Sequence, residues 1–126
     1  MKFSLGRIII FGHFIEKLKF FYVENFGFSV IEEITNQWIV LNAGQMELAI
    51  HKIGQGYEPN EGEEFRVESN IKLVFYINDN LENFRQRLIE KGVLIGDIKS
   101  FDGINSLFCD GEDPEGNVFQ IEQKLS

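Results

Sequence analysis

The sequence predicts an α+β protein built from two copies of one βαβββ module. The main observation is that a strand, an amphipathic helix closed by a glycine, and three further strands follow one another twice along 126 residues. The second observation is the register of the two copies. Gly92 follows Gly27 by 65 residues, and Leu81 follows Ile15 by 66 residues, so equivalent helix positions repeat at nearly one spacing.

The first module is expected over about residues 1–52. Residues 5–11 are apolar and β-branched, which predicts a buried strand. Residues 14–27 predict a helix because their apolar side chains recur at spacings of three and four, and Gly27 suits a left-handed C-cap. Three strands are then expected, at 28–34, 37–42 and 45–52.

The second module is expected over about residues 70–126, beginning with a strand at 70–77. A helix over 80–92 follows, with Asn78 or Asp79 as its expected N-cap. The remaining three strands are expected at 93–101, 104–110 and 117–123.

The segment 53–69 joins the two modules. It is acidic, contains Gly and Pro, and shows no periodicity. A loop of this length inside a single domain is usually a linker or part of a binding site. We therefore predict one domain over 1–126 in which this segment connects the halves.

Composition restricts the class of protein. The chain has 12 basic and 20 acidic residues, a net charge of −8, which argues against nucleic acid and against an anionic membrane surface. The charge is compatible with a cationic ligand, although an acidic surface is more often only a solubility feature. Thirteen Phe residues suit either a core or a cavity with aromatic walls.

The N-terminal residues and the single cysteine bear on localisation. Arg7 interrupts the apolar N-terminal stretch, so we expect no signal peptide. No apolar run approaches the roughly 20 residues that span a bilayer. Cys109 stands alone, so no intrachain disulfide forms and an oxidising compartment is not implied. We expect a cytoplasmic protein.

Four stretches carry a resemblance to a known superfamily: FYVENFGFSV (21–30), LNAGQMELAIH (41–51), LIEKGV (88–93) and DPEGNVFQIEQ (113–123). In this order and spacing the chain resembles the vicinal oxygen chelate superfamily, which includes glyoxalase I, bleomycin-resistance proteins, fosfomycin-resistance enzymes and extradiol dioxygenases. The resemblance covers nearly the whole chain. It implies that the two modules form a cup-shaped mixed sheet with the helices outside. It also implies a homodimer, because superfamily cups are often built or completed between subunits.

In that superfamily, metal ligands, usually His and Glu, project into the cup from the first and last strands of each module. The resemblance places Arg7, Glu47, Lys72 and Gln120 at these positions. Arginine stays cationic, lysine is protonated at neutral pH, and glutamine offers a neutral oxygen, so Glu47 is the one good ligand. We therefore expect no metal at the usual site.

An inward-facing charge needs a partner. We expect Glu47 to pair with Arg7, Lys72 or both, with Gln120 completing the hydrogen bonds. Two roles stay open for these cations: a purely structural cluster, or an anchor for an anionic group of a ligand.

Aromatic residues complete the candidate ligand-binding set. If Lys72 points into the cup, strand alternation makes Tyr76 a ligand contact and Phe75 a core residue. Trp38 and Phe108 are further candidates for the cup lining, although the sequence does not determine which way Trp38 points.

A displaced metal site is the alternative to a metal-free cup. Glu47, His51 and Glu122 would lie towards the mouth, and two carboxylates with one imidazole suffice for a weak divalent site, with Zn²⁺, Ni²⁺ or Mn²⁺ as the ion. The other interpretation is that His51 ends its strand, exposed and without a role.

Three functions follow from these observations. The first is a metal-independent protein that binds, and by analogy with bleomycin-resistance proteins sequesters, a small molecule in an aromatic cup. The second is a lyase, isomerase or dioxygenase acting on a small oxygenated metabolite, with a displaced metal or none. It is less expected, because the usual ligands are replaced and no catalytic residue can be assigned. The third is an interaction module whose Phe side chains fill the cup.

Overall fold

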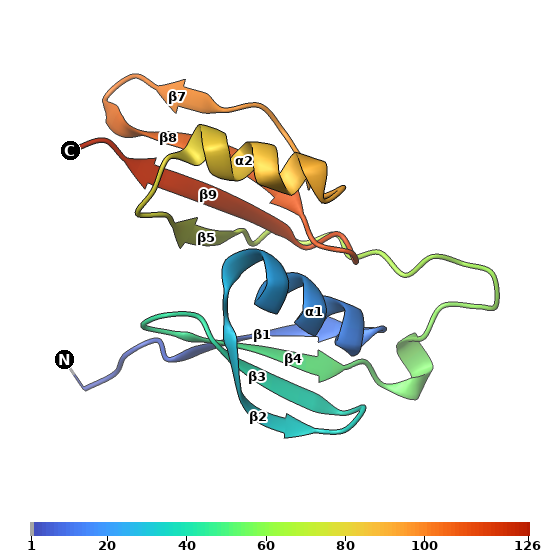
Figure 1. Ribbon diagram of the computed structural model, residues 1–126. Helices are drawn as coiled ribbons and strands as arrows, with labels where there is room; N and C mark the ends of the chain where they lie inside the picture. Colours follow the sequence, from blue (N-terminus) through green and yellow to red (C-terminus); the bar gives the residue numbers. More distant parts are fainter. Residues whose placement is uncertain (1) are drawn as a thin grey trace. The chain divides into compact units, whose positions relative to one another are not determined.

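A computed structural model describes residues 2–126 of the chain (Figure 1). The chain divides into one unit that extends to Phe65 and a second that comprises Arg66–Ser126. Each unit contains one helix and one mixed sheet. The predicted α+β fold with two repeated modules is therefore confirmed. The boundary falls inside the segment predicted as a linker, while the assignment of both units to one domain stays a prediction.

The first unit has the predicted βαβββ order, with strand order β1-β4-β3-β2 across its sheet. Strand β1 runs parallel to β4, and the other neighbours are antiparallel. The elements are β1 (Arg7–Gly12), α1 (Ile15–Phe26), β2 (Ser29–Ile34), β3 (Trp38–Asn42), β4 (Glu47–Lys52) and a 3-10 turn, η1 (Gln55–Tyr57).

Helix α1 forms because its buried side chains recur on one stripe. Leu18 and Tyr22 are fully buried and belong to the core that the helix makes with β3 and β4. The helix ends at Gly27, whose φ of 71° is the expected left-handed cap and whose N–H bonds to the Val23 carbonyl. Burial of this stripe positions the sheet beneath the helix.

The second unit repeats this topology, with strand order β5-β9-β8-β6 and β7 also on β8. Strand β5 runs parallel to β9, as β1 does to β4. The elements are β5 (Leu73–Tyr76), α2 (Leu81–Glu90), β6 (Leu94–Ile95), β7 (Lys99–Phe101), β8 (Ile104–Glu112) and β9 (Val118–Lys124).

The prediction of one continuous strand over 93–101 is wrong. It is two short strands, and both pair with β8. The break follows Gly96, whose N–H bonds to the Asp110 carbonyl. The Arg85 side chain of α2 then donates to the Gly96 carbonyl over 2.7 Å and contacts Asp97, which draws the chain away from β8.

Two local features of this unit are the start of helix α2 and the turn after β8. The N-cap of α2 is Asn80, whose side chain accepts from the Asn83 N–H, and neither Asn78 nor Asp79 takes this place. A turn follows β8. Asp113 accepts two backbone N–H bonds there, and Gly116 has a φ of 91°.

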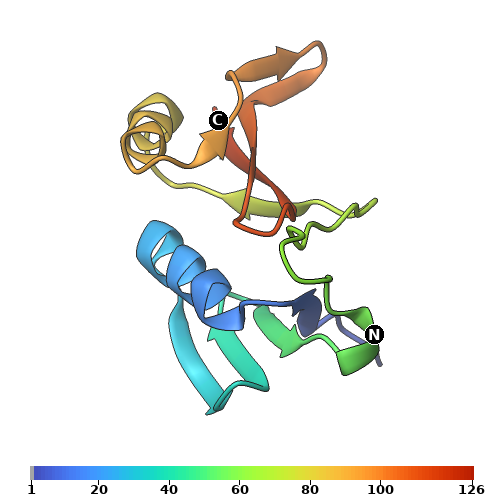
Figure 2. The same cartoon turned by 90° about the vertical axis from the view of Figure 1, so that its right-hand side faces the viewer.

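In each unit the helix covers one face of its own sheet (Figure 2). Side chains alternate along a strand, and residues that register opposite one another share a face. Each sheet therefore has one buried face, which includes Leu48 and Ile50 in the first unit and Phe119 and Ile121 in the second, and one face that its helix leaves uncovered. The predicted site residues of β1, β4 and β9 alternate with these buried residues and therefore lie on the uncovered faces. None of the helices described between residues 2 and 126 is long and apolar enough to span a lipid bilayer.

Candidate functional site

An ion pair lies on the uncovered face of the first sheet. Arg7 of β1 and Glu47 of β4 are directly opposite in the parallel ladder. The Arg7 Nε and Nη2 atoms lie 2.9 and 2.7 Å from the same oxygen, Oε1 of Glu47. The side chains are 41% and 37% exposed. The predicted pairing of Glu47 with Arg7 is therefore observed.

Trp38 of β3 borders this ion pair, which settles its orientation. The Arg7 Cζ atom lies 5.4 Å from the centroid of the indole ring, a cation–π contact. The indole N–H donates to Glu32 over 3.0 Å, and the His51 ring packs edge-on at 5.7 Å. Phe11 packs against the other side of His51 at 5.4 Å. The first face thus combines an ion pair with an aromatic row.

The second unit holds a different ion pair. The Lys72 Nζ atom donates to Asp110 Oδ2 over 2.6 Å, and the Gln120 amide donates to Asp110 Oδ1 over 3.0 Å. Lys72 and Gln120 therefore meet at a carboxylate that the sequence interpretation missed. Alternation along β8 places Asp110 on the face of Phe108, but its position opposite Gln120 depends on the register between β8 and β9. The predicted pairing of Lys72 with Glu47 joins different units and stays a prediction.

Opposing influences set the pKa of Asp110. Burial raises it, but the hydrogen bonds from Lys72 and Gln120, together with the charges of Lys72 and Lys99, outweigh burial and leave the pKa below its ordinary value. A carboxylate with a lowered pKa stabilises the fold above its unfolded pKa of about 3.9. This contribution is lost as the pH falls through the lower, folded value.

Replacing Lys72 by methionine is expected to raise the pKa of Asp110, because burial is then opposed only by Gln120 and Lys99. The acid-unfolding midpoint should move to higher pH. Carbon-detected NMR of the carboxyl groups measures the pKa, and circular dichroism between pH 2 and 6 follows unfolding. The exposed Lys91→Met variant is the control. Identical Asp110 titrations in Lys72→Met and the wild type would contradict this account.

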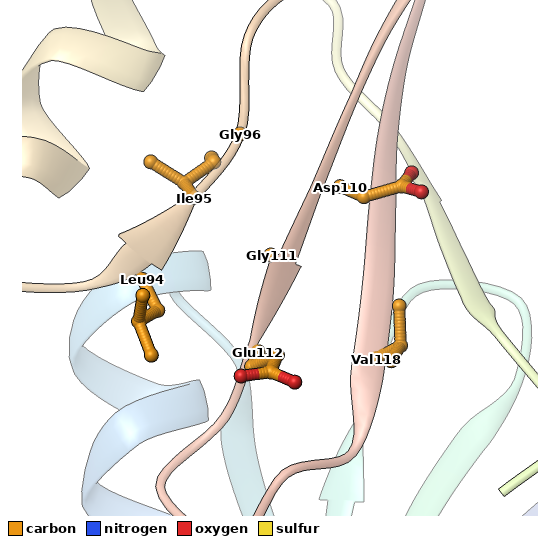
Figure 3. A pocket seen from close by; sticks show the side chains of 7 residues that line it. All are labelled: Leu94, Ile95, Gly96, Asp110, Gly111, Glu112 and Val118. Carbon is orange, nitrogen blue, oxygen red and sulfur yellow. The ribbon is translucent and has the colours of Figure 1, made fainter.

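A surface pocket of about 360 Å³ lies beside this ion pair in the second unit (Figure 3). Asp110 and Glu112 both line it, since β8 extends two residues beyond the predicted 104–110. Leu94 of β6 and Val118 of β9 register on either side of Glu112. Arg66 donates to Glu112 Oε1 over 2.5 Å. The pocket was not predicted, because the sequence of one strand does not show which residues of the neighbouring strands lie opposite it.

The remaining predicted residues of the second unit divide between surface and core. Tyr76 is 69% exposed, and the Lys124 Nζ atom lies 4.2 Å from its ring centroid. Phe75 stacks on Phe119 at 6.2 Å, so the predicted orientations of Tyr76 and Phe75 are observed. Phe108 is buried against Phe101 and offers little surface to a ligand.

The displaced metal set is split between the units. Glu47 and His51 lie on β4, and the His51 Nδ1 atom is 2.8 Å from the Lys52 carbonyl oxygen. Glu122 lies on β9 and accepts a hydrogen bond from Ser106 over 2.7 Å. Within residues 2–126, no three His, Cys, Asp or Glu side chains gather in a group that could hold a metal ion. A displaced site stays a prediction.

The residues that the sequence resemblance placed at metal-ligand positions do not fit a divalent ion. Arg7 directs two N–H groups at Glu47, so the best ligand oxygen already faces a guanidinium. Lys72 is a donor to Asp110, and Gln120 points its amide N–H₂ at the same carboxylate. Guanidinium and ammonium groups have no lone pair to offer at neutral pH. These side chains are therefore suited to hydrogen bonding and ion pairing rather than to metal ligation.

Comparison with known proteins supports the fold. No protein-family model matches the chain, and no curated protein matches it either. Among solved structures, a lactoylglutathione lyase from Agrobacterium tumefaciens matches with a TM-score of 0.75 and 13% identity, covering 95% of this chain and 92% of that one. A genomically encoded fosfomycin resistance protein from Listeria monocytogenes matches with a TM-score of 0.75 and 14% identity, covering 98% and 94%.

An integron cassette protein from the mobile metagenome of V. cholerae matches with a TM-score of 0.72 and 20% identity, covering 98% of this chain and 97% of that one. At these identities the likeness concerns the fold alone. The chain therefore has the glyoxalase fold of the vicinal oxygen chelate proteins. The resemblance inferred from its sequence is confirmed as a resemblance of fold.

Proposed function

We propose that the protein binds a small organic molecule on the uncovered sheet faces and does so without a metal ion. The observation that carries this proposal is the Arg7–Glu47 ion pair. The guanidinium of Arg7 is hydrogen-bonded to the Glu47 carboxylate that a metal ion would need as a ligand, with N···O distances of 2.9 and 2.7 Å. Displacing it would cost the hydrogen bonds and leave a cation beside the incoming ion.

The aromatic groups of these faces support a binding role. Trp38, His51 and Phe11 form a row beside the ion pair, and Tyr76 is exposed in the second unit. Aromatic rings that are at least partly exposed bind apolar or planar ligands by stacking and by burial of apolar area. Two structural neighbours are a fosfomycin resistance protein and a lactoylglutathione lyase, and both names refer to small molecules.

The first test is the metal content of untagged protein, measured by mass spectrometry, together with thermal unfolding in the presence of Zn²⁺, Ni²⁺ or Mn²⁺. We expect no stoichiometric metal and an unchanged midpoint. An ion present at 100 times its Kd would stabilise the native state by about 2.7 kcal/mol, which is roughly 10 °C for a chain of this size. About one metal per chain that disappears in Glu47→Ala would overturn the proposal.

Trp38 provides the second measurement, because the chain has one tryptophan. A ligand that reaches the first face should change its fluorescence. The Arg7→Ala variant removes the guanidinium 5.4 Å from the ring and tests whether that group takes part in binding. The supporting result is a saturable change that weakens in this variant. A library of small metabolites and antibiotics without any such change in metal-free buffer would count against ligand binding at this face.

A further inference from the structure

The pocket of the second unit presents hydrogen-bond acceptors between apolar walls. Asp110 and Glu112 contribute carboxylates, and Leu94 and Val118 stand on either side of Glu112 in the sheet (Figure 3). Gly96 lines the same pocket without a side chain. At about 360 Å³ the pocket has the size of sites for small ligands. Its complement is a molecule with N–H donors on an apolar body.

Both carboxylates already hold a cation of the chain itself. Lys72 contacts Asp110 over 2.6 Å, and Arg66 contacts Glu112 over 2.5 Å. The Arg66 hydrogen bond goes to one oxygen of Glu112, Oε1. An ionised carboxylate can accept from a planar N–H pair through both of its oxygens. The internal guanidinium thus shows which chemical group this part of the pocket accommodates.

The ion pair between Arg66 and Glu112 is partly exposed to solvent. Arg66 belongs to the segment between the two modules, and its side chain is 48% exposed. Exposed ion pairs contribute only about 0–1 kcal/mol to stability. A cationic ligand that also buries apolar area against Leu94 and Val118 gains energy that Arg66 does not.

We propose that this pocket binds a small molecule carrying an amidine, guanidine or primary amine on a flat apolar body. Glu112 is its anchor, and Arg66 is an internal competitor for the same carboxylate. The inference rests on the proposed function, because it names the class of ligand for the second unit. The net charge of −8 favours the approach of a cation over that of an anion.

Benzamidine is the probe, with benzoate and benzyl alcohol as comparators of similar shape and different charge. Titration is followed by ¹H–¹⁵N NMR in metal-free buffer, reading the amides of Gly96, Gly111 and Val118. We expect saturable shifts with benzamidine alone. Equal or tighter binding of benzoate or benzyl alcohol would overturn the proposal, as would the absence of saturable shifts with benzamidine.

Three variants assign the binding to named residues. Glu112→Gln should weaken benzamidine by at least about fivefold, since it removes one charge-assisted bond. Gly96→Leu should abolish binding by filling the pocket, and it adds no backbone clash because a Cβ there meets only the Asp110 carbonyl at 3.6 Å. Arg66→Ala should tighten binding by removing the competitor. Glu90→Gln, on α2, is the matched control.

Each variant is first checked by its amide spectrum and thermal midpoint, so that loss of binding is separated from loss of fold. Unchanged affinity in folded Glu112→Gln, or weaker affinity in Arg66→Ala, contradicts the assignment. Failure of the proposed metal-free function would be seen in a separate measurement, the metal content. Stoichiometric metal lost in Glu47→Ala concerns the first unit and is read without benzamidine.

Discussion

Replacing Gly111 by alanine is expected to lower the free energy of unfolding by about 1–3 kcal/mol or more, the range for an overpacked core. A Cβ at this position would overlap Cζ of Phe119 and would lie 2.8 Å from the Leu94 carbonyl oxygen. Neither neighbour yields easily, because Phe119 is fully buried and Leu94 contributes backbone of the paired strand β6. Urea denaturation measures the change.

Gly96→Ala is the matched control for this prediction. Gly96 lies in the same pocket and on the segment that pairs with β8, but its added Cβ would have only an ordinary contact of 3.6 Å. This variant should be neutral or stabilised by about 0.4–1 kcal/mol through the lower entropy of its unfolded chain. If Gly111→Ala and Gly96→Ala unfold at the same urea concentration, the close packing of β6, β8 and Phe119 is not as described.

The Cys109 thiol is expected to react at least about 100-fold more slowly with an aromatic disulfide reagent at pH 8 in the native protein than in urea. Burial raises its pKa from 9.0 to about 11, with Asp110 adding to the rise and Arg85 opposing it. Two pKa units reduce the reactive thiolate about 100-fold. The side chain is also only 1% exposed, which slows access further. Because the chain has one cysteine, the reagent's absorbance reports this site alone.

The same shift predicts alkaline sensitivity. A thiol whose folded pKa is raised stabilises the native state fully below its unfolded pKa, and the contribution is lost as the pH rises above about 9 towards the folded value. Cys109→Ala should remove this part of the pH dependence between pH 8 and 11. Rapid stoichiometric labelling of the native wild type would show that the thiol is accessible and the shift wrong.

Periodicity predicted the elements well because each module has strong local signals. The stripe of Leu18 and Tyr22 fixed the first helix, and Gly27 marked its end, as the structure confirms. The strand at 93–101 failed because its break depends on Arg85 reaching the Gly96 carbonyl from another element. No pattern within the strand carries that information.

The candidate site was predicted in part. Arg7 and Glu47 were paired correctly, since equivalent positions on the first and last strands of a module are neighbours in the sheet. Asp110 was missed because its role depends on which strand lies beside β9 and in which register. Arg66 was missed because it lies in a segment with no periodicity, where spacing cannot predict contacts. A single sequence does not show the register between strands or the contacts between side chains that are far apart along the chain.

Parallel pairing of β1 with β4 has a consequence for how the chain acquires its structure. Arg7 and Glu47 are 40 residues apart, so the sheet of the first unit cannot close until nearly the whole module has been synthesised. The hairpin of β3 and β4 and the helix α1 need only local contacts and can form first. Until β4 is available, strand β1 is apolar and unpaired, and its backbone N–H and C=O groups can bind other chains. During translation, this first strand is therefore exposed to misassembly until β4 has been synthesised.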